Sequence, residues 1–273
     1  LQAYKEGLAT TGQNIANVGN EAYSRREAPI SQIKSGSDAL QLSNSAGYGV
    51  KIDGITRAFD EFIDIQLQNA ASGFAFSTSQ ATVLNQLEQV VRPAQGSVSQ
   101  RLQELFSSFN IVAQDPSDLA ARHIAVDNAK ALTSSVVTVA DGISDLRNFV
   151  AKTIGDNVSE ANGVLKQIAA IQQELMGNEL IKNAPNELLD QRDSLLKDLS
   201  ELVEVSVDYS TGGSVDISIG TAGQGKTLLS GVVHSSLVIQ EVDGVSKVFL
   251  DNENGGGLSK IQVQSGKIAG SLA

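Results

Sequence analysis

Apolar residues recur every three or four positions along much of this chain, a period typical of α-helices that pack along one face. The first stripe is formed by Leu1, Tyr4, Leu8, Thr11, Ile15 and Val18. It is narrow, and Gly7 and Gly12 each cost such a helix about 1 kcal/mol relative to alanine. A helix of this length is marginal on its own. We therefore expect the stripe to need a partner surface, in this chain or in another.

The longest pattern follows Pro116 and alternates in steps of four and three. It comprises Ala125, Ala129, Leu132, Val136, Val139, Ile143, Leu146 and Val150, and it continues through Ile154 to Leu175. Consecutive steps of four around Ile154 resemble a stutter, which unwinds a supercoil locally. Residues 117 to 184 contain no proline. The pattern predicts one helix of roughly sixty residues, about 90 Å long, with Asp115 as its cap and Pro116 in its first turn.

Three shorter helices are predicted around it. One runs from Arg57 to Val91 and stops at Arg92-Pro93. Another starts at Ser97, which forms a capping box with Gln100. The third covers about 187–203, and its broad apolar stripe suits burial against two neighbours.

After Val203 the period changes to two, with Gly-rich turns between the apolar runs. Asp243-Gly244 is a strong hairpin sequence, so a small antiparallel β-domain is predicted. A shorter alternation, Val50 to Ile52, lies in a Ser- and Gly-rich connecting segment. The expected fold is mainly α with a β-rich outer domain (α+β), an elongated helical bundle around one very long helix. The expected boundaries are 1–56 for the N-terminal helix and connecting segment, 57–203 for the bundle and 204–273 for a β-rich domain that is incomplete.

Composition narrows the function classes. The 273 residues contain 4% aromatic side chains and no Trp, so the core must consist of Leu, Ile, Val and Ala. A formal net charge of −11 argues against nucleic-acid and anionic-membrane binding. The absence of Cys excludes disulfides, thiol nucleophiles and the usual zinc sites. No membrane-spanning run or secretory signal is recognisable. Because the chain starts at Leu1 and its one methionine is Met176, we expect a fragment.

Candidate enzymatic chemistry is weak. Residues Gly220 to Thr227 satisfy the phosphate-loop pattern, but that mechanism needs a following helix, and residues 228–233 are typical of a strand. A hairpin turn is therefore the favoured interpretation. The two histidines, His123 and His234, have no ligand at metal spacing, and Asp251 to Asn254 is interpreted as a turn rather than a calcium loop. No catalytic residue, cofactor or metal site is expected, and Asp190 to Asp193 is interpreted as a solvated helix face.

Two sequence motifs resemble known signatures. Asn14-Ile15-Ala16-Asn17-Val18, followed by Tyr23-Ser24-Arg25, resembles the N-terminal signature of the bacterial flagellar axial proteins. In that family the valine is usually followed by Asn-Thr-Pro-Gly, so here Gly19-Asn20 is expected to supply the positive backbone angles of the turn. A second match, to the hook-associated protein 1 family, is formed by Pro185, Asn186, Leu188, Leu189, Asp190, Gln191, Arg192 and Asp193.

The resemblance implies a structural subunit at the junction of flagellar hook and filament, not an enzyme. It implies type III export of the unfolded chain and an extracellular position in the flagellum. The implied partners are copies of the chain in a ring, the hook protein, the next hook-associated protein and an export chaperone whose site lies outside this sequence. Leu1, Tyr4, Leu8, Ile15 and Val18 are the expected assembly interface, with Asn14, Asn17 and Tyr23 shaping the turn beyond. Residues 1 to about 20 are expected to pack on another molecule or to be poorly ordered, and not to pack their stripe tightly on the bundle of their own chain.

Three alternatives stay open on the sequence. The chain could be another axial subunit of the filament or hook type, or a nucleotide-binding enzyme that uses residues 220–227. It could also be a coiled-coil signalling module that dimerises along the seam from Ala125 to Leu175.

Overall fold

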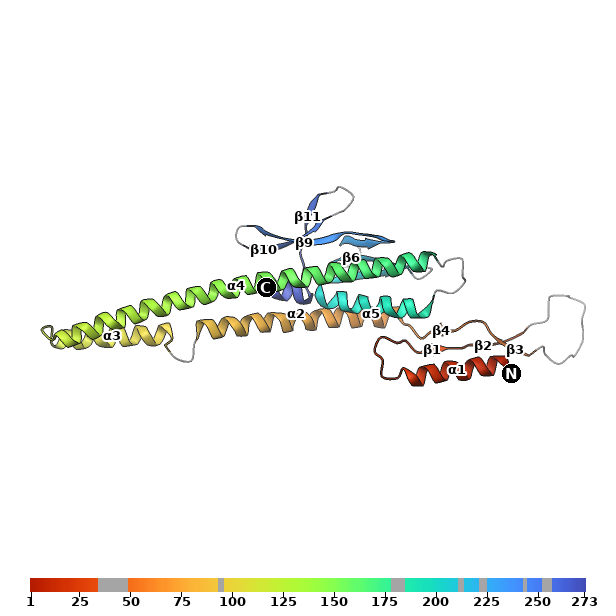
Figure 1. Cartoon of the computed structure of the whole chain (residues 1–273), viewed down its shortest axis with the longest axis horizontal. Coiled ribbons are helices and arrows are strands. Elements are labelled where there is room, and N and C mark those ends of the chain that lie inside the picture. The colour runs from red at the N-terminus through yellow and green to blue at the C-terminus, as the bar shows by residue number, and fades with distance from the viewer. Residues whose placement is uncertain are drawn as a thin grey trace, which may run out of the picture.

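The computed structural model describes residues 1–33, 49–92, 96–177, 185–210, 214–220, 225–242, 245–251 and 257–273. It is an elongated rod organised along helix α4 (Leu119–Gly177), whose 59 residues span roughly 90 Å at 1.5 Å per residue (Figure 1). The prediction of one very long helix is therefore confirmed. His123 lies exposed on its flank, as expected.

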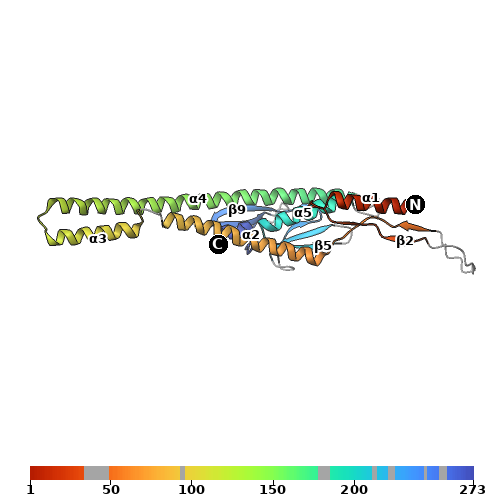
Figure 2. The ribbon, with the colours of Figure 1, turned by 90° about the horizontal axis from the view of Figure 1, so that it is seen from below.

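Shorter helices line this central one. Helix α3 (Val98–Gln114) folds back along the first half of α4, while α2 (Glu61–Val91) and α5 (Asn186–Leu202) lie along the second half (Figures 1 and 2). A short terminal helix, α6 (Gly266–Leu272), packs on α2, α4 and α5. The broad stripe of α5 is buried against its neighbours, as its width predicts.

The helix caps are partly those expected. The Oγ of Ser97 accepts a hydrogen bond from the N–H of Gln100, which confirms the cap of α3. The prediction for α4 was wrong by one turn. Asp118 caps it, because its Oδ1 accepts from Ala120 N–H at 2.7 Å. The Asp115 carboxylate instead accepts hydrogen bonds from the N–H and hydroxyl of Ser117 in a local Asx turn, so it does not cap the helix.

An N-terminal unit, formed by residues 1–33 and 49–57, occupies one end of the rod (Figure 1). It consists of helix α1 (Gln2–Ala16) and the strands β1 (Arg26–Glu27), β2 (Ile30–Gln32), β3 (Val50–Ile52) and β4 (Thr56–Arg57). Strand β1 pairs antiparallel with β4, and β2 with β3. The expected short hairpin is thus present, built by the chain leaving α1 and returning towards α2.

All strands after α5 pair antiparallel, as predicted. The first sheet has the order β5-β6-β7-β8 and is formed by Val205–Tyr209, Val215–Ile219, Lys226–Ser230 and Val233–His234. The second has the order β11-β10-β9 and is formed by Leu258–Lys260, Val245–Asp251 and Ser236–Val242. Residues 226–230 form strand β7, antiparallel to β6, so a strand follows the Gly-rich segment where a phosphate loop needs a helix, as the hairpin interpretation requires. Residues 221–224, 243–244 and 252–254 lie outside the described ranges.

One hydrophobic core joins the helices to both sheets. It contains Ile154, Leu165 and Ile168 of α4, three leucines of α5, strand residues from β5 to β10, and Ile268 of α6. The β-rich part therefore shares its core with the helical rod, whereas a separate outer body was expected. Helix α6 was not predicted, because seven residues with two glycines carry no periodic pattern. The boundaries at 56 and 203 remain an interpretation.

The apolar stripes predicted for α2 and α4 do not face this core along their whole length. In α2 the buried residues are Gln68, Ser72 and Ala75, while Ile63, Leu67 and Phe74 of the predicted stripe are exposed. The close approach of α6 explains why α2 buries its small residues, because a Cβ at Gly270 would lie 2.3 Å from the carbonyl oxygen of Phe76. Along α4 the predicted seam is buried from Ile154 onward. Nearer its start Val136 and Ile143 are exposed.

Candidate functional site

Helix α1 presents its apolar stripe to solvent. Each of Leu1, Tyr4, Leu8, Ile15 and Val18 exposes more than two thirds of its surface. The buried positions are Ala3 and Thr10, on a face roughly 125° from the centre of the stripe at 100° per residue. That face packs on β1 and β3. The stripe therefore has no partner within the described residues, as an assembly surface requires.

The first signature folds into a clamp at the end of α1. The side-chain amide of Asn14 bonds both backbone groups of Arg26: Nδ2 donates to the carbonyl oxygen at 2.9 Å, and Oδ1 accepts from the N–H at 2.8 Å. The hydroxyl of Tyr23 also donates to Asn14 Oδ1, at 2.9 Å. Asn17 Nδ2 donates to the Gln13 carbonyl oxygen. Asn14 and Tyr23 thus shape the turn, while Ala16 is exposed, Ser24 is half-buried and Arg25 pairs at the surface with Glu27.

The turn does not use the backbone expected of it. Gly19 is absent from the glycines with positive φ, so the prediction that it replaces a Pro-Gly pair was wrong for this residue. Two successive turns carry the chain round instead. Asn20 N–H donates to the Asn17 carbonyl oxygen, and Tyr23 N–H donates to that of Asn20. The Asn20 side chain accepts from Ala22 N–H, an Asx turn that needs no left-handed residue.

The second signature forms the other half of the site. Asp190 and Arg192 are 6% and 2% exposed, so the interpretation of residues 190–193 as a solvated face was wrong. Asp190 accepts from two arginines of the N-terminal unit, from Arg26 and from Arg57 Nη1 at 2.9 Å. Arg57 Nη2 lies 2.6 Å from Asp193 Oδ2. Arg192 also binds Asp193, through Nε at 2.9 Å. We call these five side chains the arginine–aspartate cluster.

The cluster connects the N-terminal unit to the rod by charge. Among the described residues the hydrophobic core includes none before Val150, so it does not reach the described part of the N-terminal unit. Further links are the Asn186 Nδ2 hydrogen bond to the Ile55 carbonyl oxygen and a longer surface pair between Lys197 and Glu21. Losing one partner of a buried ion pair typically costs about 3–5 kcal/mol, because the other charge stays buried. The geometry of the joint therefore depends on complete pairing.

Sequence reasoning missed Arg26 and Arg57. Their neighbours contained a clue, since each arginine lies two or three residues from an aromatic side chain. Arg26 stacks over Tyr23 at 4.9 Å and Arg57 over Phe59 at 4.9 Å, in cation–π geometry. Nothing in the spacing indicated which carboxylates they meet. The remaining signature residues are supporting ones: Pro185 is the N-cap residue before α5, Leu188 and Leu189 are half-buried, and Gln191 is exposed.

A second polar group extends the cluster toward the first sheet. Asp64 of α2 accepts from the Tyr209 hydroxyl at 2.7 Å and from Gln68 Nε2 at 2.7 Å. Partial burial raises the pKa of the Asp64 carboxyl, against the opposing effect of the Tyr209 hydrogen bond. The pKa of Tyr209 is raised as well, first by burial and then by its bond to Asp64. Arg192 lies over the Tyr209 ring at 5.3 Å, so both groups adjoin the cluster.

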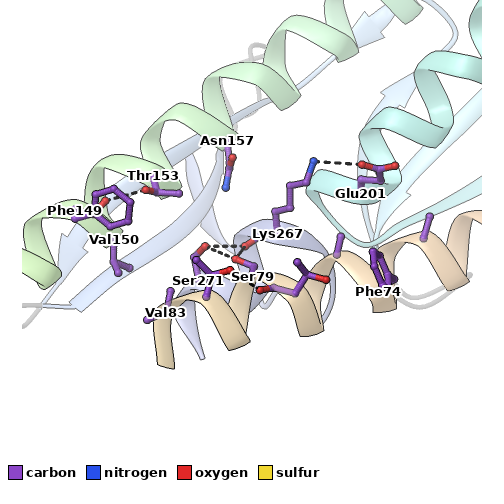
Figure 3. A pocket seen from close by; sticks show the side chains of 14 residues that line it. Phe74, Ser79, Val83, Phe149, Val150, Thr153, Asn157, Glu201, Lys267 and Ser271 are labelled. Atoms are coloured by element: carbon purple, nitrogen blue, oxygen red, sulfur yellow. Dashed lines mark hydrogen bonds and ion pairs between the residues drawn. The ribbon is translucent and has the colours of Figure 1, made fainter. Parts of the chain in front are cut away.

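A groove of about 410 Å³ opens between α2 and α4 above α6 (Figure 3). Phe74 and Val83 line it from α2, and Phe149 and Val150 from α4. At its floor Ser79 and Ser271 share a hydrogen bond of 2.8 Å, and Lys267 pairs with Glu201 at 3.3 Å. The groove offers apolar surface and hydroxyl groups, not a nucleophile paired with a base.

The aromatic residues lie outside the core. Six of the eight phenylalanines are exposed, namely Phe59, Phe62, Phe74, Phe106, Phe109 and Phe149. The largest fully buried side chains are all leucine or isoleucine. Aromatic residues are enriched in the buried centres of protein interfaces, so this distribution favours a protein that binds other proteins through several faces.

Within the described ranges, no group of three His, Asp or Glu side chains is placed to hold a metal ion. A search of the described helices likewise finds none both long and apolar enough to cross a membrane.

The chain is similar to known proteins over most of its length. Residues 84–273 match the family model of the flagellar hook-associated protein FlgK helical domain. The chain is 29% identical over 233 residues to flagellar hook-associated protein 1 of Salmonella typhimurium and 27% identical over 233 residues to that of Escherichia coli. Each alignment covers 85% of this chain but only 41% and 42% of the relative, so the chain spans about two fifths of their length.

A solved structure agrees with this similarity. The flagellar hook junction protein FlgK from Burkholderia pseudomallei superposes with a TM-score of 0.67 at 26% sequence identity. The superposition covers 76% of this chain and 38% of that one. The elongated α+β architecture is therefore shared with a solved relative.

Proposed function

Because this chain belongs to the family defined by the FlgK helical domain of flagellar hook-associated proteins, we propose that it is part of a structural subunit joining the flagellar hook to the filament. The observation that carries the proposal is the unpartnered stripe of α1, five bulky apolar side chains held on a rigid helix and left in solvent. A subunit that works by assembly needs such a surface, whereas a self-contained enzyme does not.

The proposed partners are those that the family membership and the exposed faces support. Copies of the subunit pack laterally as a ring, with hook protein on one side and the next hook-associated protein on the other. The stripe formed by Leu1, Tyr4, Leu8, Ile15 and Val18 makes the axial contacts. The exposed phenylalanines of α2 and α3 supply further contact area. Nucleic acid and membranes are not among the proposed partners, since the chain carries a net charge of −11.

We further propose that the subunit acts outside the cell, after type III export of the unfolded chain, and that it catalyses no reaction. Export through a narrow channel requires a chain without cross-links, and this one has no cysteine. An export chaperone is a further proposed partner of the full-length protein. Of the alternatives, the nucleotide-binding enzyme lacks the helix it needs after residue 227. The coiled-coil module lacks a free seam over the second half of α4, because positions from Ile154 onward are buried in this chain's own core.

Deleting the gene in its host tests the proposal. Cells without the protein should build hooks but release unassembled flagellin into the medium, and full-length wild-type protein should restore filaments. The double variant Leu8→Asp/Ile15→Asp should be exported yet fail to restore them, because two charges would enter a buried axial contact. Motile cells with intact filaments in the deletion strain would refute the junction role.

Ala9→Asp is the matched control. Ala9 is exposed on α1, well away from both the stripe and the face that packs on β1 and β3. It carries the same helix-propensity cost as the test substitutions. Filaments should therefore form with Ala9→Asp. If Ala9→Asp also failed to restore filaments, the cause would be a less stable α1 and not the change in the stripe.

A further inference from the structure

Two arginines face each other across the β1–β4 pair. The antiparallel register places Arg26 directly opposite Arg57. Their side chains are 5% and 6% exposed, so water screens neither charge well. Like charges directly opposite in a strand pair destabilise it. Left to itself, this strand pair should therefore resist closing.

The missing counter-charge comes from another part of the molecule. Asp190 of α5 accepts from Arg26 with one carboxylate oxygen and from Arg57 with the other. It lies 164 and 133 residues further along the chain than these two arginines. Asp193, one turn later on α5, adds a second contact to Arg57 at 2.6 Å. The same carboxylate thus bridges two strands and docks both on the rod.

We propose that closing of the β1–β4 pair and docking of the N-terminal unit on the rod are one coupled event, gated by Asp190. The strands stay open until α5 has folded and offers its carboxylate. Closure then fixes Arg26, whose backbone is held by Asn14 at the end of α1. The orientation of α1 and its apolar stripe is thereby set only after the rod has formed. This coupling is a property of the chain itself and holds whatever partner α1 binds.

Two measurements on the whole chain separate closure from docking. Closure is followed by hydrogen exchange of the Ala58 N–H, which donates to the Arg25 carbonyl oxygen at 2.8 Å. Docking is followed by the distance distribution between spin labels at Lys5→Cys on α1 and Lys166→Cys on α4. Both lysines are exposed, and the chain has no other cysteine to label.

Asp190→Asn should disturb both readouts together. We expect Ala58 to exchange at least tenfold faster and the label distances to broaden, while the helical content persists because the core lies elsewhere. Asp198→Asn, an exposed position on the same helix, is the matched control and should change neither. If Asp190→Asn broadens the distances but leaves Ala58 protected, closure and docking are independent and the proposal fails.

Arg26→Gln supplies a second, gentler test. It removes the same ion pair but also the repulsion, and Asp190 keeps Arg57 as its partner. Ala58 exchange should then stay within threefold of wild type. Introduced together with Asp190→Asn, Arg26→Gln should return Ala58 protection toward the wild-type value without narrowing the label distances. Failure of the double variant to recover protection would overturn the role of the arginine pair.

Discussion

Three amide side chains on helices each bond both backbone groups of one strand residue. Asn14 does so with Arg26, Asn162 with Leu237, and Gln172 with Val215. The last two lie on α4 and attach one sheet each. Because such an amide has the same donor and acceptor as a peptide group, it can replace a neighbouring strand. A helix of this chain is thereby fixed to a strand at a single register.

Gln172→Met tests how much these amide hydrogen bonds to a strand contribute to stability. Gln172 is fully buried, and Nε2 also donates to the Gly231 carbonyl oxygen at 2.7 Å. Methionine has similar volume but leaves the backbone groups of Val215 unpaired, each costing about 1–3 kcal/mol. We expect unfolding in urea to lose about 3 kcal/mol. Gln173→Met, at the adjacent exposed position, should lose almost nothing. Equal stability of the two variants would contradict this account.

The Asp64–Tyr209 pair predicts a pH dependence of stability. Burial raises the pKa of the Asp64 carboxyl in the folded state. The folded protein therefore holds this proton more tightly than the unfolded chain does. The stability that the Asp64 carboxyl contributes is fully present below its pKa in the unfolded chain, and it is lost as the pH rises through its pKa in the folded protein. In Asp64→Asn that decline is absent. The stability of wild type relative to Asp64→Asn should thus be greater near pH 4 than at pH 7, by chemical denaturation.

The matching control is again Asp198→Asn, which lies exposed on α5. Its stability relative to wild type should vary less between the two pH values. A relative stability of Asp64→Asn that rose with acidification would show that the Tyr209 hydrogen bond to the carboxylate outweighs burial.

Two glycines show how an element's surroundings decide the effect of one methyl group. A Cβ at Gly270 of α6 would lie 2.3 Å from the Phe76 carbonyl oxygen of α2, whereas Gly163 of α4 has nothing within 4 Å. Gly270→Ala must push α6 off α2 and should lower the melting temperature by several degrees. Gly163→Ala relieves the cost of glycine in a helix, about 0.5–1 kcal/mol, and should raise it. Opposite signs are the expected result, and a loss in both would contradict the open space at Gly163.

Periodicity predicted elements far better than it predicted what they contact. The long helix, α2, α5 and the antiparallel strands all follow from local spacing. The stripe of α2 was visible too, but its exposure depends on α6, a helix whose Gly-Lys-Ile-Ala-Gly-Ser-Leu sequence has no period. Likewise Asp190 and Asp193 look like any solvated helix face until two arginines from residues 26 and 57 meet them. Contacts between residues more than a hundred positions apart leave no trace in one sequence.

Burial is uneven along the whole molecule. Between Ile154 and Ile268 large side chains pack into one core that both sheets share. Toward the tip, where α3 meets the first half of α4, the buried positions among the described residues are Ser108, Ala121 and Ala125. Apolar burial stabilises by about 25 cal/mol per Å², so these small residues contribute little. The tip keeps its bulky residues, Phe106 and Phe109 among them, on the outside.

This gradient predicts that the rod does not open as one unit. Native-state hydrogen exchange should be at least tenfold faster for amides at 125–145 than for those at 155–172, although both belong to one helix. Leu165→Ala, which leaves a cavity in the core at a cost of about 2–5 kcal/mol, should speed exchange in the second range and leave the first unchanged. Equal protection along α4 would mean that the tip is stabilised by the core at a distance. Faster exchange at the tip would instead indicate that the tip is weakly stable alone. A partner bound to the exposed phenylalanines of α3 would then increase its stability.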